Sequence, residues 1–165
     1  MTTCTITRDE IRRYLPTTAQ MRQLRKLCAE HRTAKAAQDR AEQIDLQAKR
    51  QVLEVGDYRS RYDGERITDP RRDYEMYDDA DLTAFTDFCK KTHAARVALG
   101  SEITNYEMTT DCYTYRALQA VEDRLLEWAV ASVPPQYGDI RRARHTRRHF
   151  DELLRLLFQL AGARA

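Results

Sequence analysis

Three pairs of cysteine and histidine residues have the spacing of neighbours on one side of a helix. The pairs are Cys28 and His31, Cys89 and His93, and His145 and His149. Thiolate and imidazole are zinc ligands, and residues three or four positions apart share a helix face. The chain has no CxxC or HExxH motif. We therefore expect the cysteines to be core residues and the histidines to be surface or capped side chains, with no metal and no cofactor. A metal-binding enzyme remains the third functional alternative.

Acid and base catalysis would need a carboxyl group whose pKa is raised by burial. Asp78, Asp79 and Asp81 instead have the pattern of a helix start, where the helix macrodipole favours the ionised form. None of the four cysteines lies in a nucleophile motif, and the chain has no GxxxxGK or GxGxxG loop. These patterns predict a protein that is not an enzyme.

A run of five arginines marks the beginning of the last predicted helix. The arginines are Arg141, Arg142, Arg144, Arg147 and Arg148. Part of this run shares one helix face, which could contact phosphates and bind nucleic acid without reading its sequence. The alternative is that the arginines pair with the acids of residues 57–87 in the same chain. Nucleic-acid binding through this run is the second functional alternative.

Residues 57–87 combine ten acids and five arginines with four tyrosines. Tyrosine supplies rigid contact area and charge supplies orientation, as at protein interfaces. We expect contacts with a partner protein from Tyr58, Tyr62, Tyr74, Tyr77, Asp78 and Asp79. Such a surface could occupy a partner's basic groove where phosphates and bases would lie. The alternative is that the tyrosines pack this segment onto the helices with their hydroxyls outward.

The elements that position these residues are predicted to be mainly α-helical. With five Gly and four Pro in 165 residues, long stretches are free of helix breakers. We expect a single helical domain over residues 1–165: helices at 7–14 and 18–55, an acidic connector at 56–79, and three helices within residues 80–161. Asp63 and Gly64 favour a small β-hairpin at residues 58–68 with a type I′ turn, and a structured loop is the alternative.

Two of the predicted helices indicate packing partners. The long helix has an apolar seam with an alanine-lined middle, which suits a closely approaching helix. Its members are Met21, Leu24, Leu27, Cys28, Ala34, Ala37, Ala41, Ile44, Ala48, Val52 and Val55. The last helix is apolar around almost its whole circumference, which is typical of a central bundle helix or a subunit contact. We therefore predict a homodimer.

Composition limits the remaining classes of partner. The formal net charge of +2 is too small for a nonspecific coat on nucleic acid. The start of the chain lacks the pattern of a signal peptide, and the longest apolar stretch, near residues 153–160, is far shorter than the roughly 20 residues that span a bilayer. We expect a cytoplasmic protein with reduced thiols and no membrane partner.

The stretch GERITDPRRDYEMYDDADLTAF, residues 64–85, with the helix that follows it and residues 112–128, resembles the central part of small accessory proteins of phages and other mobile elements. The resemblance covers under half of the chain. It implies a protein that docks on a host or element-encoded protein, including a defence nuclease complex that itself binds nucleic acid, and an anti-CRISPR-like inhibitor is one form of this.

Overall fold

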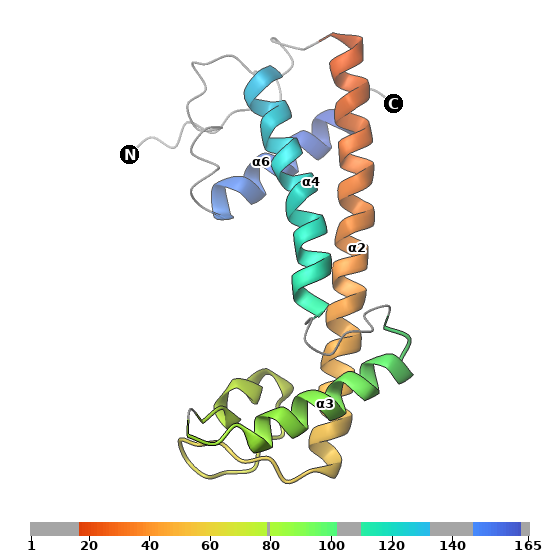
Figure 1. Ribbon diagram of the computed structural model, residues 1–165. Coiled ribbons are helices and arrows are strands. Elements are labelled where there is room, and N and C mark those ends of the chain that lie inside the picture. Colours follow the sequence, from red (N-terminus) through yellow and green to blue (C-terminus); the bar gives the residue numbers. More distant parts are fainter. Residues whose placement is uncertain (1–16, 79, 102–109, 133–146, 163–165) are drawn as a thin grey trace, which may run out of the picture. The chain divides into compact units, whose positions relative to one another are not determined.

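The computed structural model describes residues 17–78, 80–101, 110–132 and 147–162. Its elements are α2 (Thr18–Val55), the 3-10 helix η1 (Pro70–Met76), α3 (Thr83–Ala98), α4 (Thr110–Ser132) and α6 (Arg147–Gly162) (Figure 1). This part of the chain is mainly α-helical, as the sequence predicts, and contains no β-strand. None of its helices is both long enough and apolar enough to cross a membrane. The predicted helix at 7–14 and the first three arginines of the last predicted helix, Arg141, Arg142 and Arg144, lie outside the described residues.

The chain divides into two compact units, where the sequence predicts a single domain. Unit 1 comprises residues 1–35 and 117–165, and unit 2 comprises residues 36–116. Helix α2 contributes its first half to unit 1 and its second half to unit 2. Each unit has its own cluster of buried apolar side chains. The two units are therefore described separately below.

Helix α2 runs without interruption over the range that the sequence predicts, because no Gly or Pro occurs between Thr18 and Val55. Its first turn is closed by a capping box. Thr17 Oγ1 accepts a hydrogen bond from the Gln20 backbone N–H at 3.3 Å, and Gln20 Oε1 accepts one from the Thr17 N–H at 2.8 Å. Two N–H groups that would otherwise lack a helical partner are thereby satisfied.

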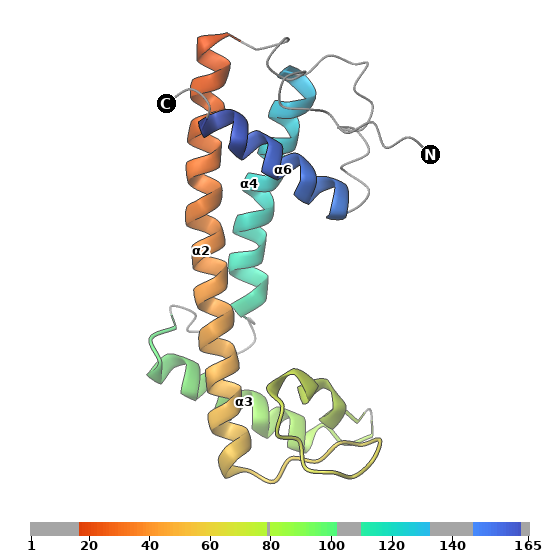
Figure 2. The same ribbon diagram turned by 180° about the vertical axis from the view of Figure 1, so that it is seen from behind.

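Unit 1 is built from the first half of α2, most of α4, and α6, which crosses the other two helices (Figures 1 and 2). The predicted seam residues of α2 in this unit are buried here; they are Met21, Leu24, Leu27 and Cys28. Leu125, Trp128 and Ala129 of α4 meet them. The Trp128 indole N–H donates a hydrogen bond to the Gln20 backbone carbonyl at 3.0 Å, so this large side chain is buried without leaving a polar group unpaired.

Helix α6 has a distinct polar side, contrary to the nearly all-round apolar character expected from the sequence. Leu153, Leu154, Leu157 and Leu160 are buried in the core of unit 1. The Arg155 and Gln159 side chains are exposed. Because one chain already buries these leucines, the apolar width of this helix no longer argues for a subunit contact, and the homodimer stays a prediction.

Unit 2 is built from the second half of α2, η1, α3 and the first turns of α4. Its core consists of Leu53, Tyr58, Ile67, Met76 and Phe88. The predicted seam of α2 is wrong at two positions: Ala37 is exposed where Gln38 is buried, and Val55 is 91 % exposed where Leu53 is buried. Near its end, α2 therefore buries Leu53 against connector residues such as Tyr58 and Ile67 instead of burying Val55.

Helix α3 begins a few residues later than the acidic pattern suggests and ends where Gly100 predicts. Its first residue is Thr83, whose backbone N–H donates to Asp81 Oδ1 at 2.9 Å. At its end, Gly100 has a φ of +85°, and the Ser101 N–H donates to the Arg96 carbonyl at 2.9 Å. This is a Schellman motif, which favours glycine because L-residues are strained at such φ values.

The predicted β-hairpin at residues 58–68 is wrong, although the chain does reverse there. A single antiparallel bridge joins Arg59 and Arg66, and neither side forms a strand. Gly64 has a φ of +71°, whereas Asp63 does not have a positive φ. A type I′ turn needs positive φ at both central residues. The turn is instead closed by the Gly64 N–H donating to the Ser60 carbonyl at 2.9 Å.

Candidate interaction surface

The connector, here residues 56–82, is held against α2 and α3 by one row of buried side chains. Tyr58 is 6 % exposed and its ring packs edge-to-face on Phe88, with 5.3 Å between the ring centroids. Its hydroxyl donates a hydrogen bond to Asp87 Oδ2 at 2.7 Å. Ile67 and Met76 are buried beside it. An irregular segment is thus anchored by apolar burial rather than by a regular hydrogen-bond ladder.

Hydrogen bonds to backbone carbonyls tie the first part of the connector to the end of α2 and to η1. The guanidinium of Arg66 donates to three backbone carbonyls at the end of α2, those of Leu53, Glu54 and Gly56, at 2.9 to 3.1 Å. These carbonyls have no helical partner of their own, so Arg66 acts as a side-chain cap of α2. The Arg61 backbone N–H donates to the Glu75 carbonyl at 2.9 Å. The turn at residues 60–65 therefore lies against η1.

Several acids of the connector are neutralised within the molecule. Arg72 forms charge-assisted hydrogen bonds with Glu75 at 2.7 and 2.8 Å, and a longer ion pair with Asp63 at 3.2 Å. The hydrogen bonds from Arg72 lower the pKa of Glu75 to about 2. Arg59 pairs with Asp57 at 3.3 Å. Asp57, Asp63 and Glu75 therefore pair with arginines of the connector itself. The sequence offered a different alternative, in which the arginines of the last helix pair with these acids.

The tyrosines of the connector divide between its inner and outer sides. Tyr62 is 66 % exposed, Tyr74 60 % and Tyr77 39 %, and Asp78 is also exposed. Tyr58 is the exception, because its ring belongs to the core, so we remove it from the predicted contact residues. Asp79 lies outside the described residues. The sequence pattern could not separate these tyrosines, because burial in an irregular segment follows no period.

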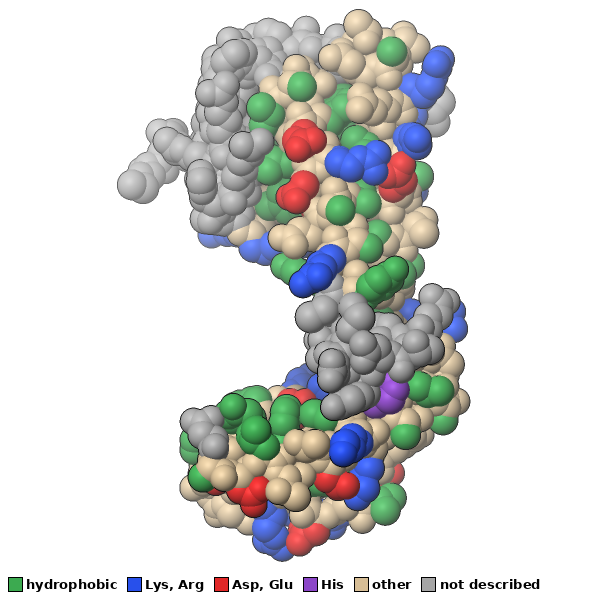
Figure 3. Space-filling model, viewed as in Figure 1, with side chains coloured by type: hydrophobic (Ala, Val, Ile, Leu, Met, Phe, Trp, Pro, Cys, Tyr) green, Lys and Arg blue, Asp and Glu red, His purple; other side chains and the backbone are tan. Residues whose placement is uncertain are grey.

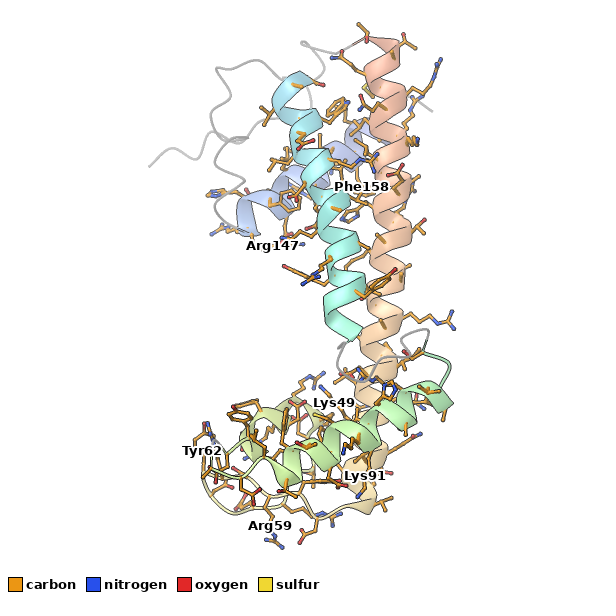
Figure 4. The ribbon with its side chains drawn as sticks, viewed as in Figure 1. Lys49, Arg59, Tyr62, Lys91, Arg147 and Phe158 are labelled. Atoms are coloured by element: carbon orange, nitrogen blue, oxygen red, sulfur yellow. The ribbon has the colours of Figure 1, made fainter. Side chains whose placement is uncertain are left out.

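Hydrophobic side chains lie at the surface over η1 and beside the start of α3 (Figure 3). Tyr62 points away from the helices at the edge of unit 2 (Figure 4). The Arg61 guanidinium lies over the Tyr62 ring, 4.8 Å from its centroid, and donates to its hydroxyl at 2.6 Å. Tyr77 packs edge-to-face on Phe85 at 5.7 Å. Both contacts orient rings that remain open to solvent on one side.

The exposed large hydrophobic side chains of the described residues all belong to unit 2. They are Val55, Tyr62, Tyr74, Tyr77, Leu82, Val97, Tyr113 and Tyr115. The described part of unit 1 has no comparable side chain. Tyrosine is enriched at protein interfaces because it contributes contact area at little entropic cost. The described parts of the two units thus differ in the large hydrophobic side chains that they expose to solvent.

A partly buried charge cluster in unit 2 was not predicted from the sequence. Lys49 of α2 pairs with Asp45 at 2.9 Å and with Asp73 of η1 at 2.8 Å, and Asp45 also pairs with Arg96 of α3 at 3.3 Å. Burial works against the charged form of Lys49, but hydrogen bonds with the two carboxylates raise its pKa overall. The only sequence signal is the four-residue spacing of Asp45 and Lys49. The cluster links α2, η1 and α3.

A second polar cluster lies in unit 1 and includes two of the singled-out residues. Glu122 of α4 is buried, and it accepts two hydrogen bonds from Arg147 of α6 at 2.9 and 3.1 Å. His31 Nε2 lies 3.4 Å from Glu122 Oε1, and the His31 ring meets Phe158 edge-to-face at 5.4 Å. Figure 4 shows Arg147 and Phe158 on α6. Arg147 thus holds α6 to α4.

Two arginines of the run, Arg147 and Arg148, form ion pairs within unit 1. Arg147 also pairs with Asp151 at 2.9 Å, and Arg148 lies 3.6 Å from Glu152. Both partners are on α6 itself. The alternative from the sequence placed the partners of these arginines in residues 57–87. Arg141, Arg142 and Arg144 lie outside the described residues. A phosphate-binding face on this helix therefore gains no support from the arginines that are described.

The three cysteine and histidine pairs do not assemble into a metal site in the described residues. Cys28 is buried, and desolvation raises the pKa of its thiol to about 11. Its neighbour His31 faces Glu122, as described above. Desolvation also raises the pKa of Cys89. No group of three or more metal-binding side chains occurs in this part of the chain, and His145 lies outside it.

Comparisons with known proteins give no relative for this chain: no family model, no curated protein and no solved structure matches it.

Proposed function

We propose that this protein acts by binding another protein, through the exposed tyrosines Tyr62, Tyr74 and Tyr77 and the neighbouring carboxylate of Asp78. It is not an enzyme in this proposal but an inhibitor or adapter of phage or mobile-element type. Its partner is a host or element-encoded protein, such as a nucleic-acid-binding defence complex, in the cytoplasm. The resemblance of residues 64–85 to accessory proteins of mobile elements supplies this setting.

One observation carries the proposal: of the exposed large hydrophobic side chains in the described residues, Tyr62, Tyr74 and Tyr77 all lie on the connector. A monomeric protein gains nothing from exposing rings that its own core could bury, so a cluster of such rings indicates an interaction site. The rings also sit on a segment that is anchored on its other side by Tyr58, Ile67 and Met76. A surface held in place before binding loses less conformational entropy on association.

Site-specific photo-cross-linking tests the proposal. A benzophenone amino acid replaces Tyr62 or Tyr74 in unit 2, or exposed Glu127 in unit 1 as the matched control, in the cells that naturally produce the protein. We expect one protein adduct from the positions in unit 2 and none from Glu127. Adducts from Glu127 alone, or from neither unit, would contradict the proposal.

The nucleic-acid alternative has its own readout. A labelled DNA or RNA oligonucleotide bound through the Arg141–Arg148 run would show an affinity that falls steeply with salt. We expect no binding at physiological salt. Tight binding that Arg147→Ala and Arg148→Ala weaken would favour the alternative.

A further inference from the structure

Building on this proposed function, we infer that the partner presents arginine side chains to the exposed tyrosines of unit 2. Guanidinium groups would stack on Tyr74 and Tyr77 and pair with the carboxylates of Asp78 and Asp81. The inference rests on the balance of charge around the rings and on the contact between Arg61 and Tyr62, in which a guanidinium already lies over an exposed tyrosine ring of the connector.

Most cations of the connector are already used inside the molecule. Arg59 and Arg72 pair with acids of the connector, and Arg66 donates to the carbonyls at the end of α2. Arg61 lies on the Tyr62 ring. Arg71 is exposed and has no carboxylate partner among the described residues. Only Arg71 therefore remains as a cation that an incoming charged group would meet on η1.

The acids near Tyr77 keep their charge unpaired. Asp78 Oδ1 accepts a hydrogen bond from the Ala80 backbone N–H, and Asp81 Oδ1 accepts one from the Thr83 N–H, each at 2.9 Å. The hydroxyl and the N–H of Thr83 lower the pKa of Asp81, so it is ionised at neutral pH. Neither carboxylate has a Lys or Arg partner in the described residues. Backbone contacts thus orient these two carboxylates, which closely follow Tyr77 in the chain, without neutralising their charge.

The contact of Arg61 with Tyr62 is an example, within the connector itself, of a guanidinium on an exposed tyrosine ring. There a guanidinium lies over the ring 4.8 Å from the centroid and also donates to the phenol oxygen. Among the described residues no cation lies over the exposed rings of Tyr74 and Tyr77, and Asp78 directly follows Tyr77 in the chain. Arginine fits such a site better than lysine, because its planar group stacks on a ring and donates to a carboxylate at the same time. Nucleic acid is disfavoured here by like charge.

The test uses the full-length protein and three fluorescent probes: an octa-arginine peptide, an octa-lysine peptide and a single-stranded oligonucleotide. Fluorescence anisotropy at low salt gives the dissociation constants. We expect the arginine peptide to bind roughly fivefold or more tightly than the lysine peptide, because ring stacking adds to equal charge. We expect no binding of the oligonucleotide.

Matched variants separate the rings and the carboxylates from general electrostatics. Tyr74→Ala with Tyr77→Ala should weaken binding of the arginine peptide roughly fivefold or more. Tyr113→Ala with Tyr115→Ala removes two exposed rings of α4 in the same unit and should leave it unchanged. Circular dichroism confirms that each variant is folded.

Charge variants complete the test. Asp78→Asn with Asp81→Asn keeps the oxygen that accepts the backbone hydrogen bond and removes the charge, so it should weaken binding; Asp123→Asn in unit 1 should not. Arg71→Gln should tighten binding about twofold, because it removes a nearby like charge.

Equal affinity for the two peptides, or equal loss from the two tyrosine double variants, would overturn the inference. If cross-links still form from Tyr62 in that case, the proposed docking surface stands and only the chemistry of the partner is wrong.

Discussion

Removing the Tyr58 side chain will loosen the connector, although this residue belongs to the tyrosine group that the sequence assigns to partner contacts. The ring is 6 % exposed and packs on Phe88. Truncation of a buried aromatic side chain costs about 3–5 kcal/mol. The cost should concentrate in unit 2, because Tyr58 contacts that core and not the core of unit 1.

Hydrogen exchange measures this loss locally. The Ile67 backbone N–H donates to the Tyr58 carbonyl at 2.7 Å, so its protection reports how often the connector opens. If 3–5 kcal/mol is lost, protection of this amide in Tyr58→Ala will fall by a factor of roughly 10²–10³ or more, since each 1.4 kcal/mol is tenfold. Trp128, the single tryptophan, lies in the core of unit 1, so its fluorescence reports the unfolding of that unit separately.

Two control variants make the result decisive. Tyr58→Phe keeps the ring and removes only the hydroxyl that donates to half-exposed Asp87, so its loss of protection will be much smaller. Val55→Ala, at a 91 % exposed position, should change stability by less than about 0.5 kcal/mol. If Tyr58→Ala costs no more than Val55→Ala, the ring is not an anchor and the division of the tyrosines into inner and outer sets is wrong.

Three further predictions follow from the same contacts. Gly56→Ala will destabilise unit 2 in urea titrations, because the added Cβ would lie 2.2 Å from a ring carbon of Tyr58; unchanged stability would show that the ring can move aside. The pKa of Glu75 is lowered from 4.5 to about 2 by Arg72, so the stability that this pair contributes is present above pH 4.5 and is lost toward pH 2. Glu75→Gln should reduce that pH dependence in denaturation followed by circular dichroism, and identical profiles would contradict this. Cys28, with a pKa of about 11, should resist alkylation at pH 8 until unit 1 unfolds, as peptide mass spectrometry can show.

The helical elements were predictable because their signals are local. The absence of Gly and Pro predicted all of α2, and Gly100, a residue type that commonly follows a helix, agrees with the end of α3 at Ala98. Pro134 and Pro135 in the sequence agree with an end of α4 at Ser132. Each of these signals acts on the backbone of a few neighbouring residues.

The connector was not predictable in the same way. Asp63 and Gly64 suggest a type I′ turn, but the chain uses a different closure that leaves Asp63 at negative φ. Whether Tyr58 or Tyr62 faces the core depends on packing against α3, which no local pattern encodes. The charge cluster of Lys49 and Arg96 likewise depends on three segments far apart in sequence. Burial in irregular segments is decided by tertiary contacts rather than by periodicity.

The most direct test of the central claim is the affinity for whichever protein cross-links to position 62. That partner, purified, is titrated against the unchanged protein, against Tyr74→Ala with Tyr77→Ala, and against Tyr113→Ala with Tyr115→Ala. Docking through the connector predicts a dissociation constant at least roughly tenfold weaker for the first variant, because interface tyrosines often contribute more than 1 kcal/mol each, and no change for the second. Unchanged binding of the first variant, with its fold intact, would contradict the claim.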